Sequence, residues 1–261
     1  MCLILFALDQ HPEFPLVLAA NRDEFYDRPT TPMHWWPDNQ CLAGRDDRSG
    51  GTWLAVSRDA AVTAVTNVRE GSGEPGRLTR GKLPLLALDQ PADELTQHLA
   101  DHGDLYAGFN LVRLAGGKGW YYSNRDAHPG RSLHRGTYGL SNHLLQSPWP
   151  KLVRLREQLR ATLAGCDPQD PEALHEALLG PLGDSTPAPD HLLPDTGIGL
   201  DQERFLSSPF IASEFYGTRA STVVTVALSG EVRVTEQQWG RGGVAGERQH
   251  FNWQQAPAGE H

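Results

Sequence analysis

The sequence has few cysteines, and they lie far apart. Cys2, Cys41 and Cys166 are the only three in 261 residues, and they form no Cys-x-x-Cys pair. An odd number of widely spaced cysteines argues against a disulfide framework and against a zinc knuckle. No uninterrupted apolar run approaches the ~20 residues of a membrane-spanning helix. We therefore expect a soluble chain with no membrane insertion and no structural metal.

Clustered positive charge is also missing. The formal net charge is −9, and the arginines are scattered among aspartates and glutamates. Binding to nucleic acid requires clustered Lys and Arg for phosphate contacts, so we expect no nucleic-acid partner. The apolar start, Met1 to Leu8, lacks the basic residues and the cleavage site of a secretion signal. This favours a cytoplasmic protein whose first strand begins at the second residue.

What the sequence does contain is enough apolar material for a large core, with 39% hydrophobic and 21% charged residues. We interpret residues 1–261 as a single domain. Residues 21–51 are rich in Pro and Asp and indicate an ordered loop, and residues 181–204 a surface excursion. The residues after Phe251 indicate a frayed tail. Alternation, helical periodicity and turn signals predict strands at 2–8, 15–20, 52–57, 61–66, 109–114, 119–123, 136–141, 220–228 and 231–236, and helices at 80–90, 92–102, 150–164 and 171–179.

The order of these elements is not a regular βαβ alternation, which argues against a doubly wound parallel sheet. Antiparallel sheets stacked on each other and flanked by helices fit better. We therefore predict an α+β fold.

The start of the chain suggests nucleophilic chemistry. The initiator Met is normally removed before a small residue, which would leave Cys2 with both a thiol and a free α-amine. An α-amine has a pKa of about 7.7–8 and a Cys thiol one of about 8.5. The two groups are matched for proton exchange near neutral pH, which suits an amine acting as base for its own thiol. A buried cysteine that merely begins a strand is the competing interpretation.

Four polar residues, Asn21-Arg22-Asp23-Glu24, follow directly after the second apolar run. If the second strand pairs antiparallel with the first, its end returns beside Cys2. Asp23 would then accept a hydrogen bond from the α-ammonium, and Arg22 would lower the pKa of the thiol. A charged β-turn is the alternative interpretation.

Two asparagines end later strands: Asn67 follows the strand at 61–66, and Asn142 follows Gly139-Leu140-Ser141. An amide at such a position can stabilise the oxyanion that forms when a thiolate attacks an acyl carbon. Either asparagine can equally cap a turn.

Short motifs in one order give the chain a resemblance to a known family. They are Met1-Cys2-Leu3-Ile4, Asn21-Arg22-Asp23-Glu24, Arg28-Pro29-Thr30, Leu42-Ala43-Gly44-Arg45-Asp46, Gly50-Gly51-Thr52-Trp53-Leu54, Thr66-Asn67, Gly139-Leu140-Ser141-Asn142 and Gly217-Thr218-Arg219-Ala220-Ser221-Thr222. Together they resemble the NRDE family, which is the family of transport and Golgi organisation protein two and its bacterial relatives. The match extends over most of the chain and is weakest at 150–205.

The resemblance implies a four-layer α-β-β-α fold similar to N-terminal-nucleophile hydrolases, and a distant similarity to the branch with penicillin V acylase and bile salt hydrolase. In that branch Cys2 matches the nucleophile, Asp23 the acidic residue near its amine, Asn67 and Asn142 the oxyanion asparagines, and Arg219 a late arginine. The branch has an arginine just before its Asn-x-Asp, where this sequence has Ala20 and carries Arg22 inside the motif instead.

Two functions remain open at this stage. One is a cysteine amidohydrolase that cleaves a non-peptide C–N bond of a small amide, with Asn21, Arg22, Glu24, Trp35 and Trp36 binding the substrate. The other, suggested by eukaryotic members of the family, is a non-catalytic carrier of haem or of an acyl-CoA or lipid metabolite. Hydrolysis requires no cofactor. Haem is a possible ligand, with His34, His128, His134 and His143 as candidate ligands. Trp35-Trp36 can equally line an apolar pocket or pack in the core.

Overall fold

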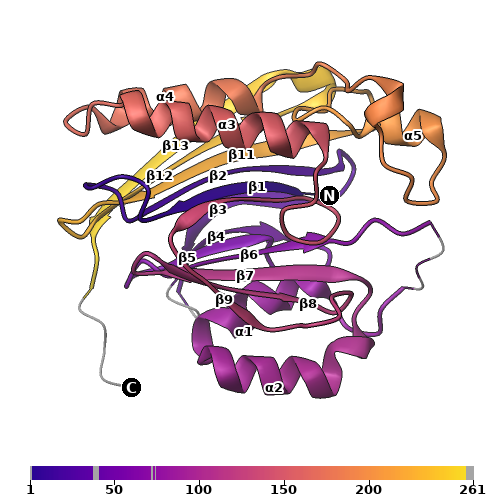
Figure 1. The fold of residues 1–261 in the computed structure, drawn as a ribbon, viewed down its shortest axis with the longest axis horizontal. Coiled ribbons are helices and arrows are strands. Elements are labelled where there is room, and N and C mark those ends of the chain that lie inside the picture. Colours follow the sequence, from indigo (N-terminus) through magenta and orange to yellow (C-terminus); the bar gives the residue numbers. More distant parts are fainter. Residues whose placement is uncertain (1, 38–40, 72, 74, 257–261) are drawn as a thin grey trace.

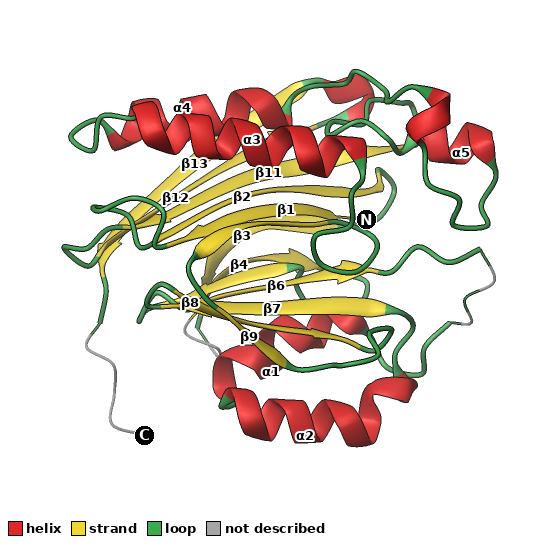
Figure 2. Ribbon diagram, viewed as in Figure 1, coloured by secondary structure: helices red, strands yellow, loops and turns green. Residues whose placement is uncertain are grey.

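The computed structural model describes residues 2–37, 41–71, 73 and 75–256, without the side chain of Cys2. Two antiparallel sheets lie face to face, with one pair of helices covering the outer face of each (Figures 1 and 2). The predicted α+β class and the α-β-β-α layering are confirmed. No helix of the described residues is long and apolar enough to cross a membrane.

The first sheet has six strands in the order β10-β1-β2-β11-β12-β13. Their bounds are Gly136–Leu140 (β10), Cys2–Leu8 (β1), Leu16–Phe25 (β2), Tyr216–Val226 (β11), Glu231–Trp239 (β12) and Ala245–Gln254 (β13). Its outer face is covered by α3 (Pro150–Gly165) and α4 (Pro171–Leu182), and α5 (Leu200–Phe205) lies in the connection from α4 to β11 (Figure 1).

The second sheet has seven strands in the order β3-β4-β5-β6-β7-β8-β9. Their bounds are Thr30–Trp36 (β3), Cys41–Asp46 (β4), Leu54–Ser57 (β5), Val62–Asn67 (β6), Phe109–Ala115 (β7), Lys118–Ser123 (β8) and Arg131–Leu133 (β9). Its outer face is covered by α1 (Leu83–Asp89) and α2 (Ala92–His102). Short 3₁₀ turns span Arg80–Lys82, Gly103–Leu105, Asp190–Leu192 and Arg241–Gly243.

The period-2 alternation of side chains decides which layer each strand residue joins. In β1, Ile4, Phe6 and Leu8 lie in the core between the two sheets. Their neighbours Leu3, Leu5 and Ala7 pack against α3 and α4 instead. β1 is thus buried on both faces, which explains why its sequence is apolar without interruption.

Two expectations about irregular segments were wrong. Residues 21–51, predicted as a loop, contain the end of β2 and all of β3 and β4, because the strands pair despite a composition rich in Pro and Asp. The tail after Phe251, predicted to be frayed, continues as strand to Gln254 and pairs with β12. Residues 257–261 lie outside the described residues.

Candidate functional site

The first residues of β1 lie between the ends of two other strands. In the β1–β2 pair Cys2 is opposite Arg22, so the end of β2 returns beside Cys2, as predicted. In the β1–β10 pair Ile4 is opposite Leu140, and Asn142 follows two residues beyond that partner. β10 ends at Leu140, so Asn142 lies in the segment that directly follows the β1–β10 ladder. The side chain of Cys2 itself lies outside the described residues.

Asp23 extends from β2 on the side of the helices and is buried, with 2% of its surface exposed. The hydroxyl of Thr218 on β11 donates a hydrogen bond of 2.8 Å to its Oδ1. Burial raises the pKa of Asp23, whereas the charge of Lys151 on α3 and the hydrogen bond from Thr218 oppose that rise. The predicted carboxylate is therefore present one residue after the partner of Cys2.

Arg22 extends from the opposite face of β2, toward the second sheet. Its guanidinium carbon lies 4.2 Å from the ring centroid of Trp53. Its Nη1 donates a 3.2 Å hydrogen bond to the hydroxyl of Thr30. Neither the indole nor the hydroxyl carries a formal negative charge, and the acidic group that the charge of Arg22 acts on is the buried Glu236, whose pKa it lowers against the effect of burial. Arg22 can therefore attract negative charge next to the start of β1.

A pocket of about 140 Å³ opens at these strand ends. It is lined by Arg22, Asp23 and Glu24 of β2, by Asn67 at the end of β6, and by Trp53 and Arg28. Asn67 is half-buried, and among the described residues its side-chain amide has no hydrogen-bond partner. An amide in that state can donate to a bound oxygen.

Asn142 is fully enclosed beside this pocket. Its Nδ2 donates a 3.0 Å hydrogen bond to the backbone carbonyl of Asn67. An amide nitrogen carries two hydrogens, so one remains for another acceptor. The backbone around Asn142 is fixed by two more bonds: the amide of Arg69 donates to the Asn142 carbonyl at 2.7 Å, and the Thr66 hydroxyl donates to the Ser141 carbonyl at 2.6 Å. The two predicted oxyanion residues thus meet, although they come from different sheets.

Asn21, expected to bind substrate, points to the helix layer instead of the pocket. Its Nδ2 donates to the carbonyls of Leu182 and Pro209 at 2.9 and 3.0 Å, and its Oδ1 accepts from Ser221. Because both ends of the amide are used in these buried contacts, Asn21 fastens the end of α4 and the 206–211 loop to β2. Alternation along β2 is the physical reason for this placement, since its neighbour Arg22 takes the pocket face.

Glu24 and Arg219 lie at the rim. Glu24 lines the pocket and forms a 3.8 Å ion pair with Arg28. Arg219 sits at a β-bulge of β11, and its Nη1 donates to the carbonyls of Phe25 and Arg28 at 2.8 and 3.2 Å. Its position thus stabilises the turn between β2 and β3, and it is not among the residues that line the pocket.

Neither tryptophan of the predicted pair lines this pocket. Trp36 is buried, and its indole N–H donates to the carbonyl of Ala43 at 2.9 Å. Trp35 packs edge-on against Trp253 with ring centroids 4.9 Å apart, and Arg58 lies over its ring. Of the two roles left open for the pair, core packing accounts for both: Trp36 packs between the second sheet and α1, and Trp35 packs against the core between the two sheets.

Three buried charged groups near the site were not predicted from the sequence. Lys151 on α3 is only 4% exposed. Arg69 and Glu203 form a buried ion pair of 2.6 Å. The signal for Lys151 was available, because it lies four residues before Leu155 on the apolar face of α3 and therefore points to the core. The signal for Arg69 and Glu203 was not available, because they are separated by 134 residues.

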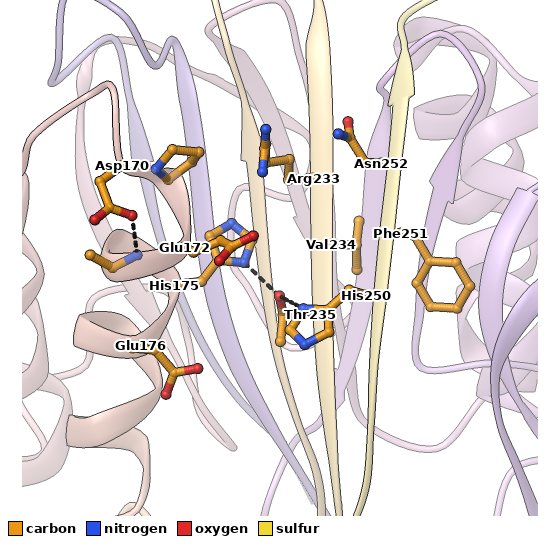
Figure 3. A pocket seen from close by; sticks show the side chains of 12 residues that line it. Asp170, Glu172, His175, Glu176, Arg233, Val234, Thr235, His250, Phe251 and Asn252 are labelled. Atoms are coloured by element: carbon orange, nitrogen blue, oxygen red, sulfur yellow. Dashed lines mark hydrogen bonds between the residues drawn. The ribbon is translucent and has the colours of Figure 1, made fainter.

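A larger groove of about 590 Å³ lies between α4 and the strands β12 and β13 (Figure 3). The buried His175 contacts the hydroxyl of Thr235 there, and Thr235 in turn contacts His250. The groove shares no lining residue with the pocket at the strand ends. None of the four histidines considered as haem ligands lines either cavity. The strand-end pocket is therefore the candidate site.

Comparisons with known proteins agree with the sequence motifs. A sequence model of the family described as Transport and Golgi organisation 2 matches residues 1–241. The Transport and Golgi organization 2 homolog of Mus musculus is 34% identical over 255 residues, covering 91% of this chain and 92% of its own. The Bos taurus homolog is 37% identical over 261 residues with the same coverage, and the Drosophila melanogaster protein is 27% identical over 270 residues.

Among solved structures, an N-acylethanolamine-hydrolyzing acid amidase ortholog of Caenorhabditis elegans is similar at 11% identity and a TM-score of 0.43. The match covers 85% of this chain and 92% of that one. A similarity this remote carries no information about the chemistry of this chain.

Proposed function

Because the chain belongs to the Transport and Golgi organisation 2 family, whose name states no reaction, we propose one from its own residues: Cys2 hydrolyses the C–N bond of a small, non-peptide amide. The observation that carries the proposal is the register at the start of β1. Cys2 is opposite Arg22, and the buried carboxylate of Asp23 follows directly. The hydrogen bond from Asn142 to the carbonyl of Asn67 also supports the proposal, because it brings the two candidate oxyanion residues together.

The reaction starts once Met1 has been removed. The α-amine of Cys2 takes the thiol proton, and the sulfur forms a bond to the amide carbon while the C=O electron pair moves to oxygen. When that pair returns, the C–N bond breaks and the ammonium gives its proton to the leaving nitrogen. The thioester is then attacked by water, whose proton passes through the amine to the sulfur as the C–S bond breaks. Amide and water give a carboxylic acid and an amine.

The second N–H of Asn142 and the side-chain amide of Asn67 are the donors for the oxyanion in this scheme. Loss of one oxyanion donor typically slows such reactions by about 10²–10³-fold. Asp23 orients the α-ammonium between proton transfers. The pocket of about 140 Å³ admits only a small group next to Cys2, which favours small amides over proteins as substrates.

The experiment uses the full chain with Met1 removed, verified by intact mass, and a β-lactone as a thiol-directed acylating probe. Peptide mapping should find the acyl group on Cys2. Cys41 provides an internal control, because burial raises the pKa of its thiol to about 11 and keeps it unreactive. The Cys2→Ala variant and a chain with an N-terminal extension should both remain unlabelled.

An unlabelled Cys2 in the chain with a confirmed free amine would refute hydrolysis. The alternative left open by the sequence, a carrier of haem or acyl-CoA, would then be tested by titrating the chain with each compound. Binding that survives in the Cys2→Ala variant would assign the scaffold a carrier role.

A further inference from the structure

Lys151 lies in the first turn of α3, directly after Pro150, and its ammonium is enclosed. Its Nζ donates to the backbone carbonyls of Leu206 and Ser208 at 2.7 and 3.4 Å. Carbonyl oxygens satisfy the hydrogens of an ammonium but do not neutralise its charge. A buried charge without a counter-charge is costly, so the surroundings of Lys151 should supply a carboxylate.

The carboxylate is that of Asp23. The positive charge of Lys151 lowers the pKa of Asp23 against the effect of burial, and the negative charge of Asp23 raises that of Lys151 in return. Arg69 and Glu203 also face Lys151, but they neutralise each other in their own 2.6 Å ion pair. Burial dominates for Lys151 and lowers its pKa to about 8.

The 206–211 loop covers both groups. It accepts from Lys151 through Leu206 and Ser208, and Ile211 exchanges bonds with Thr218: the Ile211 amide donates to the Thr218 hydroxyl at 3.0 Å, and the Thr218 amide donates to the Ile211 carbonyl at 2.8 Å. The same Thr218 hydroxyl donates to Asp23. Because the loop keeps solvent away from the two charges, their interaction is screened far less than at a surface.

We propose that Lys151 is a positioning residue of the strand-end site, whose enclosed ammonium keeps Asp23 ionised and sets the proton affinity of the thiol and amine of Cys2. This inference rests on the proposed function. The ammonium stabilises negative charge at the neighbouring strand end and so favours the thiolate. Without it, Asp23 would either take up a proton or bind the α-ammonium too strongly for that amine to act as a base.

The test measures the rate at which iodoacetamide alkylates Cys2 as a function of pH, followed by peptide mapping, in chains with Met1 removed. Lys151→Met removes the charge, Lys151→Gln retains donors for the carbonyls without charge, and Lys151→Arg retains the charge. Both neutral variants should move the midpoint of the profile to higher pH by roughly one unit, and Lys151→Arg should restore it. The exposed Lys118 is the matched control, and Lys118→Met should leave the midpoint unchanged.

An unchanged midpoint in folded Lys151→Met and Lys151→Gln chains would overturn the proposal. If these variants do not fold, NMR titration of the Lys151 ammonium in the unmodified chain decides instead. A midpoint near pH 8 that falls further in Asp23→Asn supports the proposal, and a midpoint near that of exposed lysine refutes it. Alkylation needs no turnover, so a midpoint controlled by Lys151 in a chain that the β-lactone fails to acylate would retain this proposal and remove the hydrolase.

Discussion

Asn142 donates a hydrogen bond of 3.0 Å from Nδ2 to the backbone carbonyl of Asn67 and so joins the end of β10 in one sheet to the end of β6 in the other. The first sheet also contains β1, and the pocket opens beside the Asn67 end of this bond, at the ends of β2 and β6. The bond therefore joins the two sheets next to the pocket. A single amide can serve both the assembly of the site and, with its second hydrogen, the proposed reaction.

Replacing Asn142 by Ala should have two separable effects. The Asn67 carbonyl loses its donor, which should reduce the free energy of unfolding by about 1–2 kcal/mol. Acylation of Cys2 by the β-lactone should slow by roughly 100-fold through loss of an oxyanion donor. Thr66→Val is the matched control, because it removes another bond between the same strand ends, from the Thr66 hydroxyl to the Ser141 carbonyl. An equal loss of rate in the control would show that Asn142 acts only through structure.

Breaking the buried ion pair between Arg69 and Glu203 should lower the free energy of unfolding far more than breaking an exposed ion pair. Its side chains are only 5% and 2% exposed, whereas those of the pair between Arg204 and Asp190 are 40% and 53% exposed. Glu203→Gln leaves a buried guanidinium without its counter-charge and should cost about 3–5 kcal/mol in urea unfolding. Asp190→Asn breaks an ion pair that water screens and should cost far less. Similar losses in the two variants would contradict this assignment.

The sequence could predict those parts of the site that depend on residues close to one another along the chain. The hairpin from β1 to β2 follows from two apolar runs with a short polar turn, and it alone brings Arg22 and Asp23 to the start of the chain. Asn67 and Asn142 could be singled out as residues at predicted strand ends, but only the family resemblance favoured an oxyanion role over that of a turn cap. The alternation of side chains along β2 was also sufficient to predict that Asn21 faces the helices, because residues at odd positions of β2 do so.

The remainder depends on contacts between distant segments. β3 and β4 form because β4 pairs with β5, a partner that local composition does not reveal. The 206–211 loop covers Asp23 only because Lys151, Asn21 and Thr218 bind it from three different elements. The local sequence of residues 206–211 does not indicate that contact, so the enclosure of Asp23 by this loop could be recognised only in the folded chain.

The buried Glu236, which lies between the two sheets, should make the fold less stable as the pH rises. It is fully buried, accepts a 2.7 Å hydrogen bond from the Met33 amide, and its Oε2 has no partner among the described residues. Burial raises its pKa from 4.5 to about 7. The folded chain therefore binds an extra proton between those values, and stability falls as pH rises through them. Glu236→Gln cannot ionise, so its stability relative to the unmodified chain should improve by about 2 kcal/mol from pH 5 to pH 8. A constant difference would show that the carboxyl titrates normally.

His175 should destabilise the fold in acid. Both of its ring nitrogens contact threonine hydroxyls, Thr235 at 2.8 Å and Thr225 at 2.9 Å, which can bind a neutral ring. Burial, aided by the charge of Arg233, lowers its pKa from 6.5 to about 4.

Below pH 6.5 the unfolded chain takes up a proton on His175 that the folded chain does not bind until about pH 4. The free energy of unfolding therefore falls as the pH falls through that window. Between pH 7.5 and 5 the unmodified chain should lose about 2 kcal/mol more stability than His175→Gln, measured by urea unfolding. Equal pH dependence in the unmodified chain and His175→Gln would mean that the folded chain admits a charged ring at this site.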